Sequence, residues 1–587
     1  MSQQNYVAAQ ENQCSLEMEA VNRKAESVDS ITTRTLVEIA YDSHLTQQCG
    51  KILVDALSDH LGSIQKGDGP VQRWRNPEDN LAHASRILDG AEFSGVDDLV
   101  ENFSELLQLS LKHGQNLNHP CCVGHQVPAP LPLVGLFDAV TTMTNQVQGV
   151  YEMGPWGIAA ERAVIDLIAE KMGFTPGRFG GLVTSGGSLG NLTALLAARN
   201  EACPWLWNHG TRSENMHDPG ATVKSETCCD AGEGISSAHC GDGQSGTFDA
   251  ESIMSSHGKS PVLVVHGDAH YCVDRAAGVM GIGQANVLRV PLDENRQMDV
   301  AALDALLGKL REKKVPVIAV VAVACTTAIG AFDPIEPIAD VCEHHQVWLH
   351  VDAAHGGAVC LSRQHRHLVQ GLQRADSVVV DAHKMMFVPA VCAIVIYRNK
   401  KNRFRAFEQS APYLFDPSAP DMSEYDNGVV TFECTKRSAT LGLWASLSMF
   451  GLELFEQLVD RVFLVARQFH DALAETPEFE VFSKPQANIV VFRYMPEAVE
   501  AATLKDSDGL RLKLSRLQLR MRRRILESGF GYLTQTTLNG EVYLRCTIMN
   551  PLTYLEHLET IVGELKRIGP HLWDELATEE NDGSSND

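Results

Sequence analysis

Runs of apolar residues alternate with helical patterns through the middle of the chain. Strands are predicted from runs that are apolar throughout, near 181–184, 262–266, 287–290, 317–324, 347–351, 377–380 and 393–397. Between them, apolar residues recur at helical spacing over 189–199, 300–313 and 335–345. Strands without polar alternation, joined by helices, are typical of a mainly parallel sheet that helices cover on both faces. The pattern therefore predicts an α/β fold for this part of the chain.

Both ends of the chain carry different patterns. Helical spacing of apolar residues from Ile31 to about Leu111 predicts a helical N-terminal segment. After Trp444 the order is helix, strand, helix, strand and a closing helix, over 452–473, 488–494, 510–528, 541–548 and 554–568. This order predicts a smaller α+β C-terminal domain. We expect five regions: a disordered tail (1–30), the N-terminal helical segment (31–135), a large α/β domain (136–450), the α+β domain (451–570) and a disordered acidic tail (571–587).

One segment inside the large domain has almost no periodicity. Residues 203–259 are rich in Gly, Ser, His and acidic residues. A stretch of that length without secondary structure is uncommon inside a compact domain, so we interpret it as a surface insertion.

Composition and charge exclude several classes of function. Across 587 residues, 49 Lys and Arg stand against 74 Asp and Glu, which gives a net charge of −25. Such a charge repels phosphate backbones, so we expect no nucleic-acid partner. The sequence contains no stretch of about 18 uncharged apolar residues, so no membrane span is predicted. The polar N-terminus does not resemble a secretory signal, and the 15 cysteines lack the paired spacing of a zinc site. We therefore expect a cytoplasmic protein without a structural metal.

Two features lie where ligands bind in open parallel sheets, outside the carboxyl ends of the strands. Thr184-Ser185-Gly186-Gly187-Ser188-Leu189-Gly190-Asn191 follows a predicted strand and opens a helix. Its small residues and free backbone N–H groups suit a phosphate, although a Ser N-cap with a glycine turn is the better explanation when they are considered alone. Asp352 ends the predicted strand 347–351, where it either caps a turn or neutralises a buried cation.

Two further features follow other predicted strands at the same edge. Lys384 comes directly after the strand 377–380, and a desolvated lysine near another cation has a lowered pKa and becomes nucleophilic. The alternative is a solvated lysine at a strand end. His270 opens a helix after the strand 262–266, where a satisfied core histidine is the usual explanation.

Together these four features meet the requirements of pyridoxal 5′-phosphate (PLP). A lysine forms the imine with the cofactor aldehyde, and a helix N-terminus holds the phosphate. A carboxylate keeps the pyridine nitrogen protonated, because a unit charge at ~4 Å in an effective dielectric of ~20 contributes roughly 4 kcal/mol. A flat imidazole covers the ring. Independent structural explanations do not place all four residue types at one edge, so the sequence predicts a PLP site.

The region from about His119 to Met549 resembles the group II PLP-dependent amino acid decarboxylases. The resemblance rests on several strings in family order: Val150-Tyr151-Glu152-Met153-Gly154-Pro155, TSGGSLGN, Thr326 to Pro334, WLHVDAAHGG at 348–357 and DAHKMM at 381–386. Within this family, these strings are most similar to those of glutamate decarboxylase. The resemblance implies fold type I of the PLP-dependent enzymes and an active homodimer with its sites at the subunit boundary.

The resemblance also implies residue roles. Lys384 is the covalent attachment point, Asp352 pairs with the pyridinium nitrogen, and His270 stacks on the ring opposite Ala354. Other implied cofactor contacts are Gly187, Ser188, Thr327 and His383. Tyr413 matches the tyrosine of the catalytic loop, with His270 as the second candidate for the proton donor. Arg545 and Gln126 match substrate-binding residues, although an ordinary ion pair is the alternative for Arg545.

Several residues depart from the family pattern. They leave the cofactor chemistry intact and bear instead on the identity of the substrate. The family often has Trp or Tyr at His355, Gly at Cys325 and Asn at Asp381, and Pro128 replaces a pocket serine. We predict α-decarboxylation of a small acidic or ω-polar L-amino acid, glutamate-like, to an amine and CO₂. The alternatives are an L-2,4-diaminobutyrate decarboxylase, an aldehyde synthase on the same scaffold, and a non-catalytic homologue.

Overall fold

The computed structural model describes residues 35–210, 260–407, 424–499 and 508–581. They fall into two compact units, the first with the described residues 35–60 and 76–113 and the second with residues 61–75 and the described residues from 114 onwards. The first unit is helical, as the N-terminal pattern predicts, with α2 (Leu36–Ala40), most of α3 (Ser43–Ile64), α4 (Pro77–Asp89) and α5 (Val96–His113). The domain boundaries at 30, 135, 450 and 570 remain predictions.

A seven-stranded sheet forms the centre of the second unit. Its strands are β1 (Gly180–Thr184), β2 (Val262–His266), β3 (Val287–Val290), β4 (Val317–Val323), β5 (Leu349–Asp352), β6 (Ser377–Asp381) and β7 (Ala393–Tyr397). They lie in the order β1-β7-β6-β5-β4-β2-β3. The pairs from β3 to β6 are parallel, and β7 is antiparallel to both of its neighbours. The prediction of a mainly parallel sheet is confirmed.

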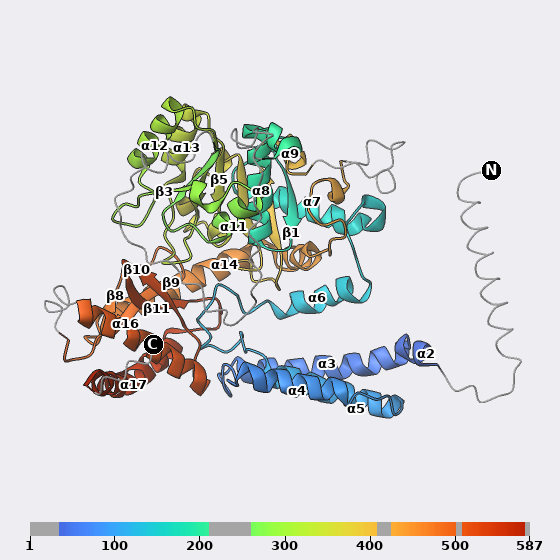
Figure 1. Cartoon of the computed structure of the whole chain (residues 1–587). Coiled ribbons are helices and arrows are strands. Elements are labelled where there is room, and N and C mark those ends of the chain that lie inside the picture. Colours follow the sequence, from blue (N-terminus) through green and yellow to red (C-terminus); the bar gives the residue numbers. More distant parts are fainter. Residues whose placement is uncertain (1–34, 211–259, 408–423, 500–507, 582–587) are drawn as a thin grey trace, which may run out of the picture. The chain divides into compact units, whose positions relative to one another are not determined.

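Helices cover both faces of this sheet because the side chains of each strand are apolar on both sides. Val264 of β2 packs in one core cluster with α12 (Val300–Glu312) and α13 (Ile335–His345). Its neighbours Leu263 and Val265 pack in another cluster with α8 (Gly187–Ala202) and α11 (Cys272–Val279). Figure 1 shows α12 and α13 side by side, with α8 and α11 apart from them. Because helices cover both faces of the sheet, a ligand site is expected at the carboxyl ends of the strands.

Two of the remaining helices precede the large sheet in sequence, α6 (Pro132–Met143) and α7 (Pro155–Lys171). The short helix α9 (Trp205–His209) lies between β1 and β2, and α14 (Thr440–Ala474) follows the sheet. The pattern before Met172 suggests one long helix, but the structure has two, separated by residues 144–154. Gly154 and Pro155 explain the interruption, since Pro155 begins α7 at a position where its missing N–H costs no hydrogen bond.

The C-terminal region forms the predicted α+β arrangement. A four-stranded antiparallel sheet has the order β10-β11-β9-β8, with β8 (Phe479–Val481), β9 (Ile489–Tyr494), β10 (Thr534–Leu538) and β11 (Glu541–Thr547). The helices α16 (Asp508–Ser528) and α17 (Leu555–Asn581) pack together beside it (Figure 1). Inside α14, Gly451 leaves helical geometry at a φ of 66°.

The disordered acidic tail predicted from residue 571 is wrong over its described part. Helix α17 continues to Asn581, and Leu572 and Leu576 are buried in the core. These two apolar residues, four positions apart on one helix face, outweigh the acidic residues between them. The predicted tail at 1–30 and most of the insertion at 203–259 lie outside the described residues. In the part of the chain that is described, no helix has the length and apolar character of a membrane span.

Candidate active site

The carboxyl ends of five strands meet at one cavity of about 270 Å³. Its lining comes from the segments that directly follow β1, β2, β4, β5 and β6. It includes these residues singled out by the sequence: Gly187, Ser188, His270, Thr327, Asp352, Ala354, His383 and Lys384. The structure therefore brings together all the residues of the predicted cofactor site that lie in the described ranges.

Lys384 projects into this cavity from the turn after β6. Its Nζ lies 3.0 Å from Oδ2 of Asp381, the last residue of that strand. Burial alone lowers the pKa of Lys384, but Asp381 and Asp352 outweigh burial, so the pKa is raised. This direction is opposite to the one expected from the sequence, because two carboxylates rather than a cation face the amine.

Asp352 and His270 occupy neighbouring positions in the cavity lining. Asp352 ends β5, is almost fully buried, and accepts a hydrogen bond from the N–H of Ala354 at 3.1 Å. His270 accepts one from the N–H of Cys272 at 3.3 Å. Burial lowers the pKa of His270, Asp352 opposes this change, and Lys384 adds to it. The imidazole is therefore held neutral at pH 7.

The N-terminus of α8 lines the cavity at the place where the sequence predicts a phosphate cradle. Gly186 has a φ of 115°, which an L side chain rarely adopts. A Cβ on Gly187 would lie 2.6 Å from Oδ1 of Asp381, so only glycine allows this approach. The hydroxyl of Ser185 donates to Glu433 at 2.6 Å. Nothing in the sequence linked Glu433 to this loop, because 248 residues separate the two side chains.

The two predicted substrate residues lie outside the cavity lining. Arg545 on β11 is 6% exposed, and its Nη1 donates to the backbone oxygen of Thr327 at 2.5 Å. Burial lowers the pKa of Arg545. Among the described residues, neither Nε of Arg545 nor Nε2 of Gln126 has a hydrogen-bond partner, although both atoms are buried. Arg545 thus borders the cavity through Thr327, while Tyr413 lies outside the described residues.

Comparison with known proteins supports the family that the sequence resembles. Residues 249–495 match the family model of the pyridoxal-dependent decarboxylase conserved domain. This match and the relatives below support the group II PLP-dependent amino acid decarboxylases as the family of this chain. The decarboxylase is 26% identical to rat cysteine sulfinic acid decarboxylase over 93% of this chain and all of that protein. It is also 26% identical to a mouse acidic amino acid decarboxylase, over 85% of this chain and 82% of that protein.

Solved structures show the same fold. Mouse CSAD superimposes with a TM-score of 0.72 at 24% identity, covering 90% of this decarboxylase and 98% of that chain. Oryza sativa TDC with PLP and tryptamine has a TM-score of 0.74 at 19% identity, covering 92% and 100%. The decarboxylase therefore has the fold of the fold-type I PLP enzymes. Its activity as a PLP-dependent carboxy-lyase is supported by the family match and the curated relatives.

The residue types that line the cavity of the decarboxylase are those that PLP requires. It offers a buried amine at Lys384, a carboxylate at Asp352 and a helix N-terminus whose Gly187 leaves room for close approach. Oδ1 of Asp381 has no hydrogen-bond partner in the described part of the chain, although it is buried. Because a carboxylate oxygen accepts hydrogen bonds, only a hydrogen-bond donor would complete its set.

Other cavity residues were missed from the sequence. Asn191 and Cys272 line the cavity, and Nδ2 of Asn191 donates to the Cys272 sulfur at 3.4 Å. His355 has its Nε2 2.8 Å from Oδ1 of Asn488, and burial lowers its pKa to about 3. The sequence showed His355 as a departure from the family but gave no indication of its contact with Asn488, 133 residues away.

Proposed function

We propose that this decarboxylase acts on a small L-amino acid with an acidic or ω-polar side chain, glutamate-like in size, and releases the corresponding amine and CO₂. The observation that carries the proposal is the buried guanidinium of Arg545 beside Thr327, at the border of the cofactor cavity.

A buried arginine needs an anionic or acceptor partner. No carboxylate lies within ion-pair distance of Arg545 among the described residues, and burial already disfavours its charge. A distal carboxylate or sulfinate would supply the missing charge and accept the free N–H of Nε. Gln126, whose buried Nε2 also lacks a partner in the described ranges, is a second donor for the same group.

The other site residues would take the roles that the family resemblance implies. Asp352 would keep the ring nitrogen of the cofactor protonated, Lys384 Nζ would be the point of covalent attachment, and His270 and Ala354 would pack against the ring. Gly187 and Ser188 would hold the phosphate, with His383 beside them. PLP, when bound, supplies an electron sink for the bond that breaks between Cα and the α-carboxylate.

A proton must return to Cα after CO₂ has left. We propose the phenol of Tyr413 as the donor, with His270 as the second candidate. The lowered pKa of His270 makes this residue a poor proton donor at neutral pH, because the neutral imidazole carries a single N–H. This direction favours a donor other than His270.

Relatives with acidic substrates support the same choice. Rat cysteine sulfinic acid decarboxylase and the mouse acidic amino acid decarboxylase both take their names from acidic amino acids. Their 26% identity supports the reaction class more strongly than one substrate. We therefore place glutamate, aspartate and cysteine sulfinate together as the substrates to test first.

We also propose a homodimer in the cytoplasm. Helix α6 exposes four apolar side chains at helical spacing, Leu133, Leu136, Val140 and Met143. Trp156 and Phe432 in the same unit are exposed as well. Apolar residues in such numbers indicate a surface that another protein covers, and a second copy is the partner the family resemblance implies. The free thiols of the described cysteines suit a reducing compartment.

Steady-state kinetics on Arg545 variants tests the substrate proposal. We expect Arg545→Lys to lose about 10- to 100-fold in kcat/KM for the acidic substrate, since a charged hydrogen bond contributes roughly 1.5–3 kcal/mol. Bound cofactor, measured by its visible absorbance, should be unchanged. Arg567→Lys at an exposed ion pair is the matched control. Unchanged kcat/KM in Arg545→Lys, or no acidic amino acid among the substrates, would contradict the proposal.

A further inference from the structure

A second cavity lies at the opposite edge of the large sheet. Its volume is about 620 Å³, within the range of roughly 300–1,000 Å³ that small-molecule sites occupy. Its lining includes Val317 at the start of β4, Trp348 just before β5, Asp376 just before β6 and Glu201 near the end of α8. The cofactor cavity lies at the other ends of these elements, about 24 Å away along the 16 residues of α8. We call this second cavity the amino-end cavity.

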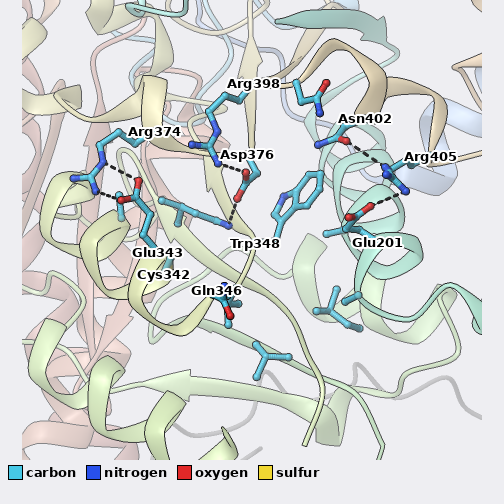
Figure 2. A pocket seen from close by; sticks show the side chains of 18 residues that line it. Glu201, Cys342, Glu343, Gln346, Trp348, Arg374, Asp376, Arg398, Asn402 and Arg405 are labelled. Carbon is cyan, nitrogen blue, oxygen red and sulfur yellow. Dashed lines mark hydrogen bonds and ion pairs between the residues drawn. The ribbon is translucent and has the colours of Figure 1, made fainter. Parts of the chain in front are cut away.

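The charges of the amino-end cavity balance. Its lining holds three arginines, Arg374, Arg398 and Arg405, and three acids, Glu201, Glu343 and Asp376. Figure 2 shows the Asp376–Arg398 and Glu201–Arg405 pairs on two sides of the Trp348 indole. Their N–O distances are 2.5 Å and 2.6 Å. Arg398 and Arg405 are each 46% exposed, so these pairs contribute little and exchange readily for ligand contacts.

A balanced lining selects against strongly charged ligands. A polyanion would meet three carboxylates, and a polycation would meet three guanidinium groups. A zwitterion places its carboxylate on a guanidinium and its ammonium on the neighbouring carboxylate. The indole between the two pairs then offers an apolar surface for a side chain (Figure 2).

A chain of buried hydrogen bonds leads from this indole toward the cofactor cavity. The Nε1–H of Trp348 donates to Oγ of Ser377 at 2.9 Å, and Nδ1 of His350 lies 2.8 Å from the same oxygen. Nε2 of His350 lies 2.7 Å from Oδ1 of Asn191, whose Nδ2 donates to Cys272 Sγ at 3.4 Å. Asn191 and Cys272 line the cofactor cavity. The two cavities are therefore joined by one continuous polar chain.

The neutral ring of His350 and the orientation of the Asn191 amide give these hydrogen bonds one consistent set of directions. Burial lowers the pKa of His350 to about 4, so its ring is neutral at pH 7 and carries one N–H. Asn191 Oδ1 accepts that N–H at Nε2, which leaves Nδ1 as the acceptor for the Ser377 hydroxyl. Ser377 in turn accepts the indole N–H. A shift of the indole can therefore reach Asn191 and Cys272 through this series of hydrogen bonds.

We propose that the amino-end cavity binds a zwitterionic α-amino acid of zero net charge with an apolar side chain, and that the Trp348–Ser377–His350–Asn191–Cys272 chain transmits its binding to the cofactor cavity. This site is separate from the substrate site, and it does not depend on which amino acid the enzyme decarboxylates.

Binding is tested on holoenzyme whose cofactor has been fixed by borohydride reduction, because an amino acid can then no longer react at the active site. L-methionine and L-phenylalanine should quench tryptophan fluorescence saturably, and the quench should vanish in Trp348→Phe. Butyrate and butylamine, which each carry one of the two charges, should bind at least tenfold more weakly. The double variant Glu201→Gln/Arg405→Gln should weaken methionine binding at least tenfold, with Arg311→Gln on α12 as the matched control. No saturable quench, or equal binding of the single-charge probes, would overturn the site.

Transmission is tested on the same reduced enzyme through the fluorescence of the reduced cofactor. In the wild type, methionine should change this fluorescence at the concentrations that quench tryptophan. Ser377→Ala should keep the tryptophan quench and lose the cofactor signal, whereas Ser377→Thr, which keeps the hydroxyl, should retain both. An unchanged cofactor signal in the wild type, or a signal that survives in Ser377→Ala, would overturn transmission through this chain. Neither outcome bears on decarboxylation of acidic substrates, so the two proposals fail independently.

Discussion

At the scale of single residues, the charges around Lys384 decide how the site works. The amine faces Asp381 and Asp352, which raise its pKa against the effect of burial. Asp352 acts on the amine through its charge, and it is also the carboxylate that we propose for the ring nitrogen of the cofactor. Asp381 ends the neighbouring strand and touches the phosphate cradle at Gly187. The family often has Asn at this position, so this chain adds a negative charge where the usual residue is neutral.

Replacing Asp352 with Asn should separate binding of the cofactor from its activation. The loss of a unit charge at ~4 Å corresponds to roughly 4 kcal/mol in an effective dielectric of ~20. We expect kcat to fall by about 10²–10³-fold while most of the cofactor stays bound by visible absorbance. Asp304→Asn, at a half-exposed ion pair with His345, is the control. A kcat within threefold of the wild type would contradict the role of Asp352.

His350 should make the stability of the protein depend on pH. Its pKa is about 4 in the folded protein and near 6.5 in the unfolded chain, so the unfolded chain binds the proton first. Stability therefore falls as pH decreases from about 6.5 to 4, by ~1.4 kcal/mol per pH unit for this proton. In His350→Asn the apparent melting temperature should decrease less between pH 7 and pH 5 than in the wild type. Parallel curves for the two proteins would exclude His350 as a source of this dependence.

At the scale of elements, apolar runs located the strands of the large sheet closely. The predicted limits of Val262–His266, Val287–Val290 and Ala393–Tyr397 agree with the structure, because these strands are buried on both faces. Two strands of the smaller sheet were missed. Thr534–Leu538 is a polar edge strand with exposed side chains, and Phe479–Val481 is only three residues long. Neither carries a periodic signal that stands out from a loop.

The site residues, too, were predictable only where a local sequence pattern marks them. Lys384, Asp352 and His270 were predictable because each follows an apolar strand, and the sheet topology then places strand ends together. Glu433 and the buried Glu161–Lys436 pair were not, because their contacts join segments 248 and 275 residues apart. Contacts of that kind depend on how loops pack, and no local pattern in a single sequence records them.

The buried Glu161–Lys436 ion pair links the segment after residue 424 to helix α7 and to the end of β1. Lys436 Nζ contacts both carboxylate oxygens of Glu161 on α7 at 2.9 Å and 3.0 Å, and the backbone oxygen of Val183 at 3.0 Å. Both side chains are buried. Breaking such a pair leaves an uncompensated buried charge, which costs about 3–5 kcal/mol.

Lys436→Met should therefore lower the apparent melting temperature by several degrees. Lys436→Met/Glu161→Gln should recover part of the loss, because the stranded charge is then absent and the amide still accepts the Val183 N–H. Lys566→Met, in a pair that is 41% exposed at the lysine, is the control and should change little. A double variant less stable than Lys436→Met alone would show that the charge is not the cause.

At the scale of the whole molecule, the proposed homodimer would use the exposed side of α6. Leu136 and Val140 are each about half exposed on the surface of the second unit. A charge there would disfavour any interface that covers the helix, whereas it costs an isolated chain little. The homodimer proposal thus depends on a surface separate from the cofactor cavity.

Leu136→Asp/Val140→Asp should convert the dimer to monomers in sedimentation experiments at assay concentration. We expect decarboxylation to fall with the dimer, since the family resemblance places the sites at the subunit boundary. Leu512→Asp, at a more exposed position on α16, should leave assembly unchanged. A fully active monomer would contradict the proposed assembly, and an unaffected dimer would place the interface elsewhere.

The attachment point of the cofactor tests the central claim most directly. The holoenzyme is reduced with borohydride, digested with protease, and the peptide that carries the phosphopyridoxyl group is identified by mass spectrometry. The account predicts a single modified residue, Lys384, and no covalently bound cofactor in Lys384→Ala. Modification of any other lysine, or a labelled Lys384→Ala protein, would contradict it.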